Sequence, residues 1–72
     1  MKISKDKVGK NIRLRTRYGR FVEGKLESVK NGVLTIRQNI GSSAEWELGG
    51  LTTMLEGQVV AIEDVDDKRD EQ

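Results

Sequence analysis

VGKNIRLRTRYGRFVEGKLESVKNGVLTI, which spans residues 8–36, carries the clearest secondary-structure pattern of the chain. Apolar and polar residues alternate along it and glycines interrupt it, a pattern typical of antiparallel strands. The first strand is expected from Lys10 to Arg17. Residues two positions apart in a strand share one face of the sheet. One face of this strand therefore carries a basic stripe, formed by Arg13, Arg15 and Arg17.

Two turns are expected in this stretch. The first is Tyr18-Gly19-Arg20, because an odd-length loop keeps the apolar positions of both strands on one face, and Gly19 suits a turn position with positive φ. The resulting register would place Arg15 opposite Glu23. The second turn is Asn31-Gly32, the preferred pair of a type I′ hairpin, and it leads into a third strand expected over residues 33–39.

The second half of the chain predicts two further strands. The fourth is expected over residues 44–55, and its apolar phase shifts after Gly49-Gly50, as at a β-bulge. The fifth is expected from Val59 to Val65. Its first four residues are apolar on both faces, which indicates either central burial or an edge that another chain covers.

The expected fold is all-β. A short amino-terminal helical turn, capped by Ser4 and ended by Gly9, precedes a five-stranded, strongly bent antiparallel sheet that forms a small barrel. The barrel domain is expected to occupy residues 1–65. Residues 66–72 are predicted to be an acidic, disordered tail, because they are charged and lack apolar periodicity.

Composition narrows the functional classes. The chain has 72 residues and no cysteine or histidine, which excludes a disulfide and a thiolate or imidazole metal site. No catalytic residue, metal site, cofactor or small-molecule substrate is expected, because nothing pairs a nucleophile with an evident base and no glycine-rich phosphate motif occurs. No run approaches the ~20 apolar residues of a membrane span. A cytoplasmic protein without membrane contact is therefore expected.

Charge is distributed unevenly along the chain. Residues 1–38 hold eleven Lys and Arg against three acidic residues, a net charge of +8, whereas residues 39–72 hold two against nine, a net charge of −7. One interpretation is a protein with a distinct basic surface. The alternative is that the two halves neutralise each other across one small fold.

Three segments resemble motifs of the Sm-like (LSm/Hfq) superfamily. Val8–Leu14 is similar to its opening GK-x-hydrophobic-x-hydrophobic, Gly19–Leu26 to its G-r-x-x-x-G-x-L segment, and Leu55–Ile62 to its second motif, I-R-G-x-x-hydrophobic-x-x-I. The resemblance implies a bent five-stranded sheet and rings of six or seven subunits, in which the fourth strand of one subunit pairs with the fifth of the next. It also implies RNA binding.

Two positions depart from the family pattern. Asn31 is the only nearby counterpart of the family asparagine that contacts an RNA base, and its place in the turn explains it equally well. Glu56 replaces the family arginine, and a carboxylate repels phosphate and has no guanidinium donors. The usual uridine pocket is therefore expected to be absent or altered.

The expected RNA contacts are the basic stripe and the neighbouring turns. Guanidinium groups spaced ~6.6–7 Å along a strand can meet successive phosphates, and aromatic residues beside them can stack on unpaired bases. The candidates are Arg13, Arg15, Arg17, Tyr18, Arg20, Lys30 and Asn31. For the stripe, the alternative is a solvated face with a cross-strand Arg15–Glu23 pair. For the aromatic residues, the alternative is that Phe21 caps the core and Tyr18 covers the turn.

The expected oligomer interface uses the last two strands. Its candidates are Trp46, Leu48, Val59, Val60, Ala61 and Ile62. The leading hypothesis is a non-enzymatic homo-oligomeric ring that binds single-stranded RNA. The alternatives are a protein–protein scaffold that has the barrel without RNA recognition, and a ribosome-associated SH3-like domain such as the carboxy-terminal barrel of RimP.

Overall fold

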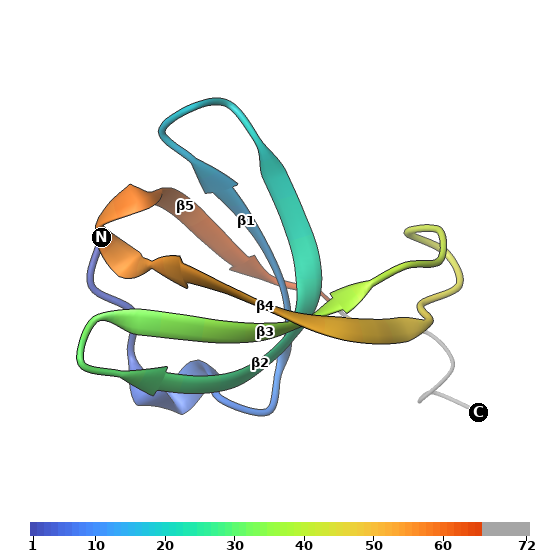
Figure 1. Cartoon of the computed structure of the whole chain (residues 1–72). Coiled ribbons are helices and arrows are strands. Elements are labelled where there is room, and N and C mark those ends of the chain that lie inside the picture. Colours follow the sequence, from blue (N-terminus) through green and yellow to red (C-terminus); the bar gives the residue numbers. More distant parts are fainter. Residues whose placement is uncertain (66–72) are drawn as a thin grey trace.

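The chain has the expected all-β fold, five antiparallel strands in one curved sheet after a short 3-10 turn (Figure 1). The computed structural model describes residues 1–65, so the predicted disordered tail, residues 66–72, lies outside the described part. The strands are β1 (Asn11–Thr16), β2 (Phe21–Lys30), β3 (Val33–Asn39), β4 (Leu48–Leu55) and β5 (Val59–Asp64). Their order across the sheet is β4-β3-β2-β1-β5, which places β4 and β5 at its two edges.

The core lies on the inner face of the curved sheet. Side chains alternate between the two faces of a strand, so alternate residues of β1, of β3 as far as Ile36 and of β2 as far as Leu26 reach the core. The residues between them form the outer face. The buried cluster comprises Ile3, Ile12, Leu14, Val22, Leu26, Leu34, Ile36 and Val59. Among the described residues, no helix is long and apolar enough to cross a membrane.

The β1–β2 hairpin has the predicted loop length, but the loop lies one residue earlier. The backbone N–H of Thr16 donates to the carbonyl oxygen of Arg20 at 2.8 Å, so the loop is residues 17–19. Gly19 has a φ of +83°. A three-residue hairpin loop commonly ends on its positive-φ residue, and this rule places Gly19 last in the loop rather than in its middle.

The shift of the loop changes the pairing of the basic stripe. Arg13 lies opposite Glu23, and Arg15 lies opposite Phe21. The expected pairing of Arg15 with Glu23 is therefore wrong by two residues. The error did not exchange the faces of the sheet, because both registers keep the same parity.

The β2–β3 turn is confirmed as predicted. Asn31 and Gly32 have φ values of 53° and 76°, and two successive positive φ values are what a type I′ turn requires. Further along β2, Gly24 lies so close to β3 that a Cβ would collide with the carbonyl oxygen of Arg37 and the side chain of Ile36. This close approach accompanies the bend of β2 (Figure 1).

β4 is shorter than expected. It begins at Leu48, and residues 44–47 belong to the loop after β3. The side-chain oxygen of Asn39 accepts a hydrogen bond from the backbone N–H of Glu47 at 2.9 Å, which closes this loop on itself. The predicted bulge at Gly49-Gly50 is present as a register shift between β3 and β4.

The amino-terminal turn is short and capped as expected. It spans Lys5–Lys7, and the Ser4 hydroxyl accepts a hydrogen bond from the backbone N–H of Asp6 at 3.2 Å. The ammonium group of Lys7 donates to the carboxylate of Asp64 at 2.8 Å. This ion pair joins the turn to the end of β5.

Candidate nucleic-acid interface

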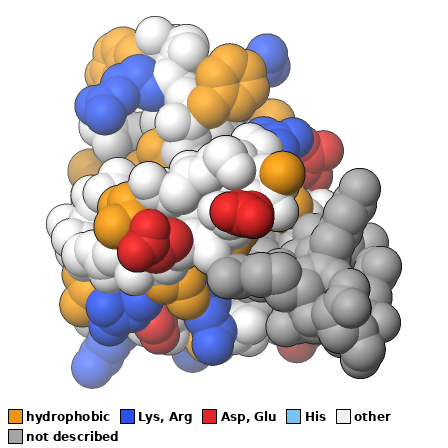
Figure 2. Space-filling view, turned by 90° about the vertical axis from the view of Figure 1, so that its right-hand side faces the viewer, with side chains coloured by type: hydrophobic (Ala, Val, Ile, Leu, Met, Phe, Trp, Pro, Cys, Tyr) orange, Lys and Arg blue, Asp and Glu red, His pale blue; other side chains and the backbone are white. Residues whose placement is uncertain are grey.

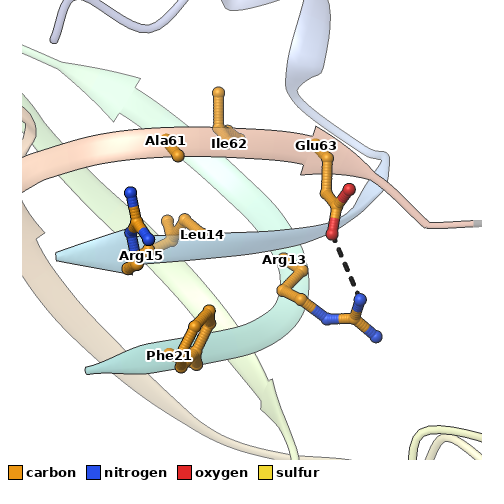
Figure 3. Close-up of a pocket in the computed structure, with 7 residues that line it drawn as sticks. All are labelled: Arg13, Leu14, Arg15, Phe21, Ala61, Ile62 and Glu63. Carbon is orange, nitrogen blue, oxygen red and sulfur yellow. Dashed lines mark hydrogen bonds and ion pairs between the residues drawn. The ribbon is translucent and has the colours of Figure 1, made fainter. Parts of the chain in front are cut away.

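Arg13 stands in the middle of an ion-pair row that crosses three strands on the outer face. Its Nε donates to Oε2 of Glu23 on β2 at 2.7 Å. Its Nη1 donates to Oε1 of Glu63 on β5 at 3.1 Å, the contact drawn in Figure 3. The pKa of Arg13 is raised by the hydrogen bond with Glu23 and by the negative charge of Glu23, and to a smaller extent by Glu63. The positive charge of this candidate residue is therefore balanced by carboxylates of its own chain.

Arg15 lies two residues further along β1 in a different setting. Its cross-strand neighbours are Phe21 on β2 and Ala61 on β5, and these residues line a groove of about 300 Å³ on the outer face (Figure 3). Arg15 is exposed and forms no ion pair with another residue of the range 1–65. Phe21 is 67% exposed, so it does not cap the core.

The loop of the first hairpin extends this basic and aromatic surface. Tyr18 is 72% exposed, and Arg17 and Arg20 beside it are exposed as well. Figure 2 shows hydrophobic and basic side chains together at its upper end, where this hairpin lies. Acidic side chains lie lower down, and further basic ones lie at the bottom of the view. We call this surface the hairpin patch; it comprises Arg15, Arg17, Tyr18, Arg20 and Phe21.

Lys30 and Asn31 lie away from the hairpin patch, at the opposite end of β2 (Figure 1). Their turn is next to the connection between β4 and β5, where the backbone N–H of Glu56 donates to the carbonyl oxygen of Gly32 at 2.8 Å. Asn31 is thus explained by its turn geometry. The structure brings together four of the seven sequence-based RNA candidates. It adds Phe21, which was not among them and for which the sequence left both stacking and a core position open.

Glu56, which stands where the resemblance implies an arginine, holds the amino-terminal segment. Its Oε2 accepts a hydrogen bond from the backbone N–H of Ile3 at 3.1 Å. Ile3 itself is buried in the core. The carboxylate therefore has a role within the fold, which the motif comparison alone did not reveal.

Two of the expected interface residues are buried within their own chain. Trp46 is 2% exposed and Val59 is 1% exposed. The pairing of β5 with β1 is irregular at Val60, which leaves Val59 facing the core and Val60 facing outward. Trp46 lies in the loop before β4 instead of on a strand, and its indole N–H has no hydrogen-bond partner among the described residues.

The remaining interface candidates lie on the two edge strands. Leu48 and Val60 are 41% and 45% exposed, whereas Ala61 and Ile62 are half-buried. Sequence analysis did not single out Leu51 and Leu55 of β4, which are both 56% exposed. We call Leu48, Leu51 and Leu55 the β4 leucines. The available signal for Leu51 and Leu55 was their alternation after the bulge.

Comparisons of the chain with protein-family models, with curated proteins and with solved structures found no match. Membership of the Sm-like superfamily therefore stays a prediction from the three motifs.

Proposed function

We propose that this chain is a non-enzymatic protein that binds single-stranded RNA through the hairpin patch. The observation that carries the proposal is the combination of two exposed rings with three arginines that have no ion-pair partner within residues 1–65. Exposed rings stack on unpaired bases of any sequence, and guanidinium groups neutralise phosphates. The bases of a duplex are already stacked and unavailable to the rings, so the patch favours single strands.

The proposal includes assembly into a homo-oligomeric ring. In the described sheet, β4 and β5 each have a neighbour on one side only, and an unpaired edge is a template for pairing with another chain. The exposed β4 leucines lie on one of these edges. A ring would also repeat the hairpin patch, and linked sites bind one strand far more tightly than a single site does.

A fluorescence anisotropy titration with labelled single-stranded RNA tests the proposal. We expect binding that weakens as salt increases, because phosphate contacts release counterions. Arg15→Gln should weaken binding about 3- to 10-fold at low salt, as the loss of one direct contact does. Arg13→Gln is the matched control, since it removes the same charge from the same strand face, and it should weaken binding less than about twofold.

Two outcomes would contradict the proposal. One is the absence of binding at low salt, and the other is binding that salt does not change. Equal losses for Arg15→Gln and Arg13→Gln would show that long-range attraction, and not contact with the hairpin patch, governs affinity.

A protein–protein scaffold is the second candidate function, and Glu56 favours it. Where the resemblance implies an arginine for RNA, this carboxylate holds the amino-terminal segment. A pull-down with and without nuclease separates the candidates, since only protein-mediated partners survive nuclease treatment. Co-sedimentation with ribosomes tests the alternative of a ribosome-associated SH3-like domain. The cytoplasmic location is a separate prediction, made from the sequence.

A further inference from the structure

The inner face of the sheet changes from apolar to polar at the end near the hairpin patch. Most inner-face side chains are the buried aliphatic residues of the core. At this end they are Thr16 of β1, Gln38 of β3 and Thr52 of β4, and Gln58 joins them from the connection before β5. Thr52 pairs with Ile36 in the strand register, which places its side chain on the core-bearing face.

These polar residues line a pocket of about 300 Å³, at the lower end of the range for ligand sites. Val22 and Met54 supply apolar surface to it. Tyr18 and Arg20 of the hairpin patch line it as well, and none of its described lining residues is acidic. We call it the hairpin pocket. Its size suits a single base with its sugar, and its chemistry combines an aromatic ring, a cation and uncharged polar groups.

The polar side chains of the hairpin pocket have hydrogen-bonding capacity to spare. Within residues 1–65, the amides of Gln38 and Gln58 and the hydroxyl of Thr52 make no hydrogen bond to another protein group. A carboxamide offers a donor and an acceptor side by side, which is the pattern that matches the edges of nucleobases. The Thr16 hydroxyl differs, since it accepts the backbone N–H of Arg20 at 3.2 Å and shapes the loop.

We propose that the hairpin pocket binds one nucleotide of the RNA strand and reads its base through the carboxamides of Gln38 and Gln58. This inference rests on the proposed RNA binding and deepens it. Tyr18 and Arg20 belong to both the hairpin patch and the hairpin pocket. A strand that crosses the tip of the hairpin therefore passes from Arg15 on the outer face to the pocket on the inner face, next to positive charge throughout. The chain would thus prefer one base over the others at one position of the strand.

The test compares four single-stranded homopolymers of equal length, one for each base, by anisotropy at fixed salt. We expect the intact chain to bind one homopolymer at least about fivefold more tightly than the weakest. The double variant Gln38→Leu, Gln58→Leu should abolish this preference and keep the salt dependence. Thr35→Val is the control, because it removes a hydroxyl from β3 outside the pocket, and it should keep the preference.

A second measurement uses the unaltered protein and therefore does not depend on the folding of a variant. The four nucleoside 5′-monophosphates are added one at a time, and NMR follows the side-chain amide signals of Gln38 and Gln58. The preferred nucleotide should shift both signals in a saturable way. The amide of Asn39, which lies outside the pocket, serves as the internal control and should not move.

The outcomes separate the two proposals. Salt-dependent binding of RNA without any base preference, or a preference that the double variant retains, overturns the hairpin pocket alone. Absence of RNA binding at low salt overturns the proposed function, and unmoved amide signals would then overturn the pocket as a nucleotide site too. A double variant that changes the oligomeric state instead of the base preference would assign the pocket to a subunit interface and also overturn it.

Discussion

At the scale of single residues, Gly24 gives the sharpest prediction for stability. A Cβ at this position would collide with the backbone of β3, which cannot move without breaking the β2–β3 pairing. Gly24→Ala should therefore lower the free energy of unfolding by roughly 1–3 kcal/mol, the usual cost of overpacking. The matched control is Gly50→Ala, because a Cβ at Gly50 meets no atom within 4 Å.

Urea unfolding, followed by tryptophan fluorescence, measures the effect of Gly24→Ala. A lower midpoint with an unchanged slope reports lost stability. If Gly24→Ala and Gly50→Ala have the same midpoint, β2 can move away from β3, and the close approach at Gly24 is not needed for the fold.

Residue patterns located the basic stripe but not the electrostatic state of its members. Alternation placed Arg13 and Arg15 on one face of β1, and the strand register confirms this. It could not show that Glu63, 50 positions away in the sequence, would bind Arg13. Alternation places Phe21 on the same face as Glu23, but it could not show that Phe21 would lie opposite Arg15.

At the scale of elements, the ion pair between Lys7 and Asp64 joins the amino-terminal turn to β5. The hydrogen bond from Lys7, with the charges of Lys7 and Lys10, holds the pKa of Asp64 below its ordinary value of 3.8. A carboxyl group whose pKa is lower in the folded state stabilises the fold above its unfolded pKa. Its contribution is lost as the pH falls below 3.8 through the folded pKa.

This linkage predicts a difference between two variants in acid. Asp64→Asn should lose less stability than the unaltered chain as the pH is lowered below 3.8, because its side chain does not titrate. Asp6→Asn is the control. Asp6 lies next to Lys7 in the amino-terminal turn but forms no ion pair among the described residues. Urea midpoints over a pH series measure the effect. If the midpoints of Asp64→Asn and of the unaltered chain fall equally as the pH is lowered, the prediction is contradicted.

Sequence predicted elements best where a local conformation required a particular residue. Asn31-Gly32 fixed the type I′ turn, and Gly49-Gly50 marked the bulge. The start of β4 was missed because Ala44, Trp46 and Leu48 alternate like a strand. The side-chain oxygen of Asn39 instead accepts hydrogen bonds from the backbone N–H groups of Gly41 and Glu47, which close that segment into a loop. No periodicity encodes such a contact.

At the scale of the whole molecule, both interpretations of the uneven charge apply to different regions. Ion pairs of Lys7 and Lys10 with Asp64, and of Arg13 with Glu63, join the basic half to the acidic half. The hairpin patch projects beyond these pairs. The small net charge of +1 therefore conceals a locally basic end, and RNA affinity should depend on this end instead of on the net charge.

Assembly through the two edge strands would give the protein a defined mass in solution. If β4 pairs with β5 of another copy, sedimentation equilibrium at micromolar concentration should give about 49 or 57 kDa, six or seven times the chain mass of 8.1 kDa. Leu51→Lys with Leu55→Lys should shift the protein to the 8.1 kDa species, because lysines on an edge strand oppose pairing. Val8→Lys is the control, since Val8 is also exposed but belongs to neither edge strand, and it should leave the mass unchanged. An unaltered chain that sediments at 8.1 kDa would contradict ring assembly. It would leave RNA binding to a single hairpin patch, whose affinity would then lack any gain from repeated sites.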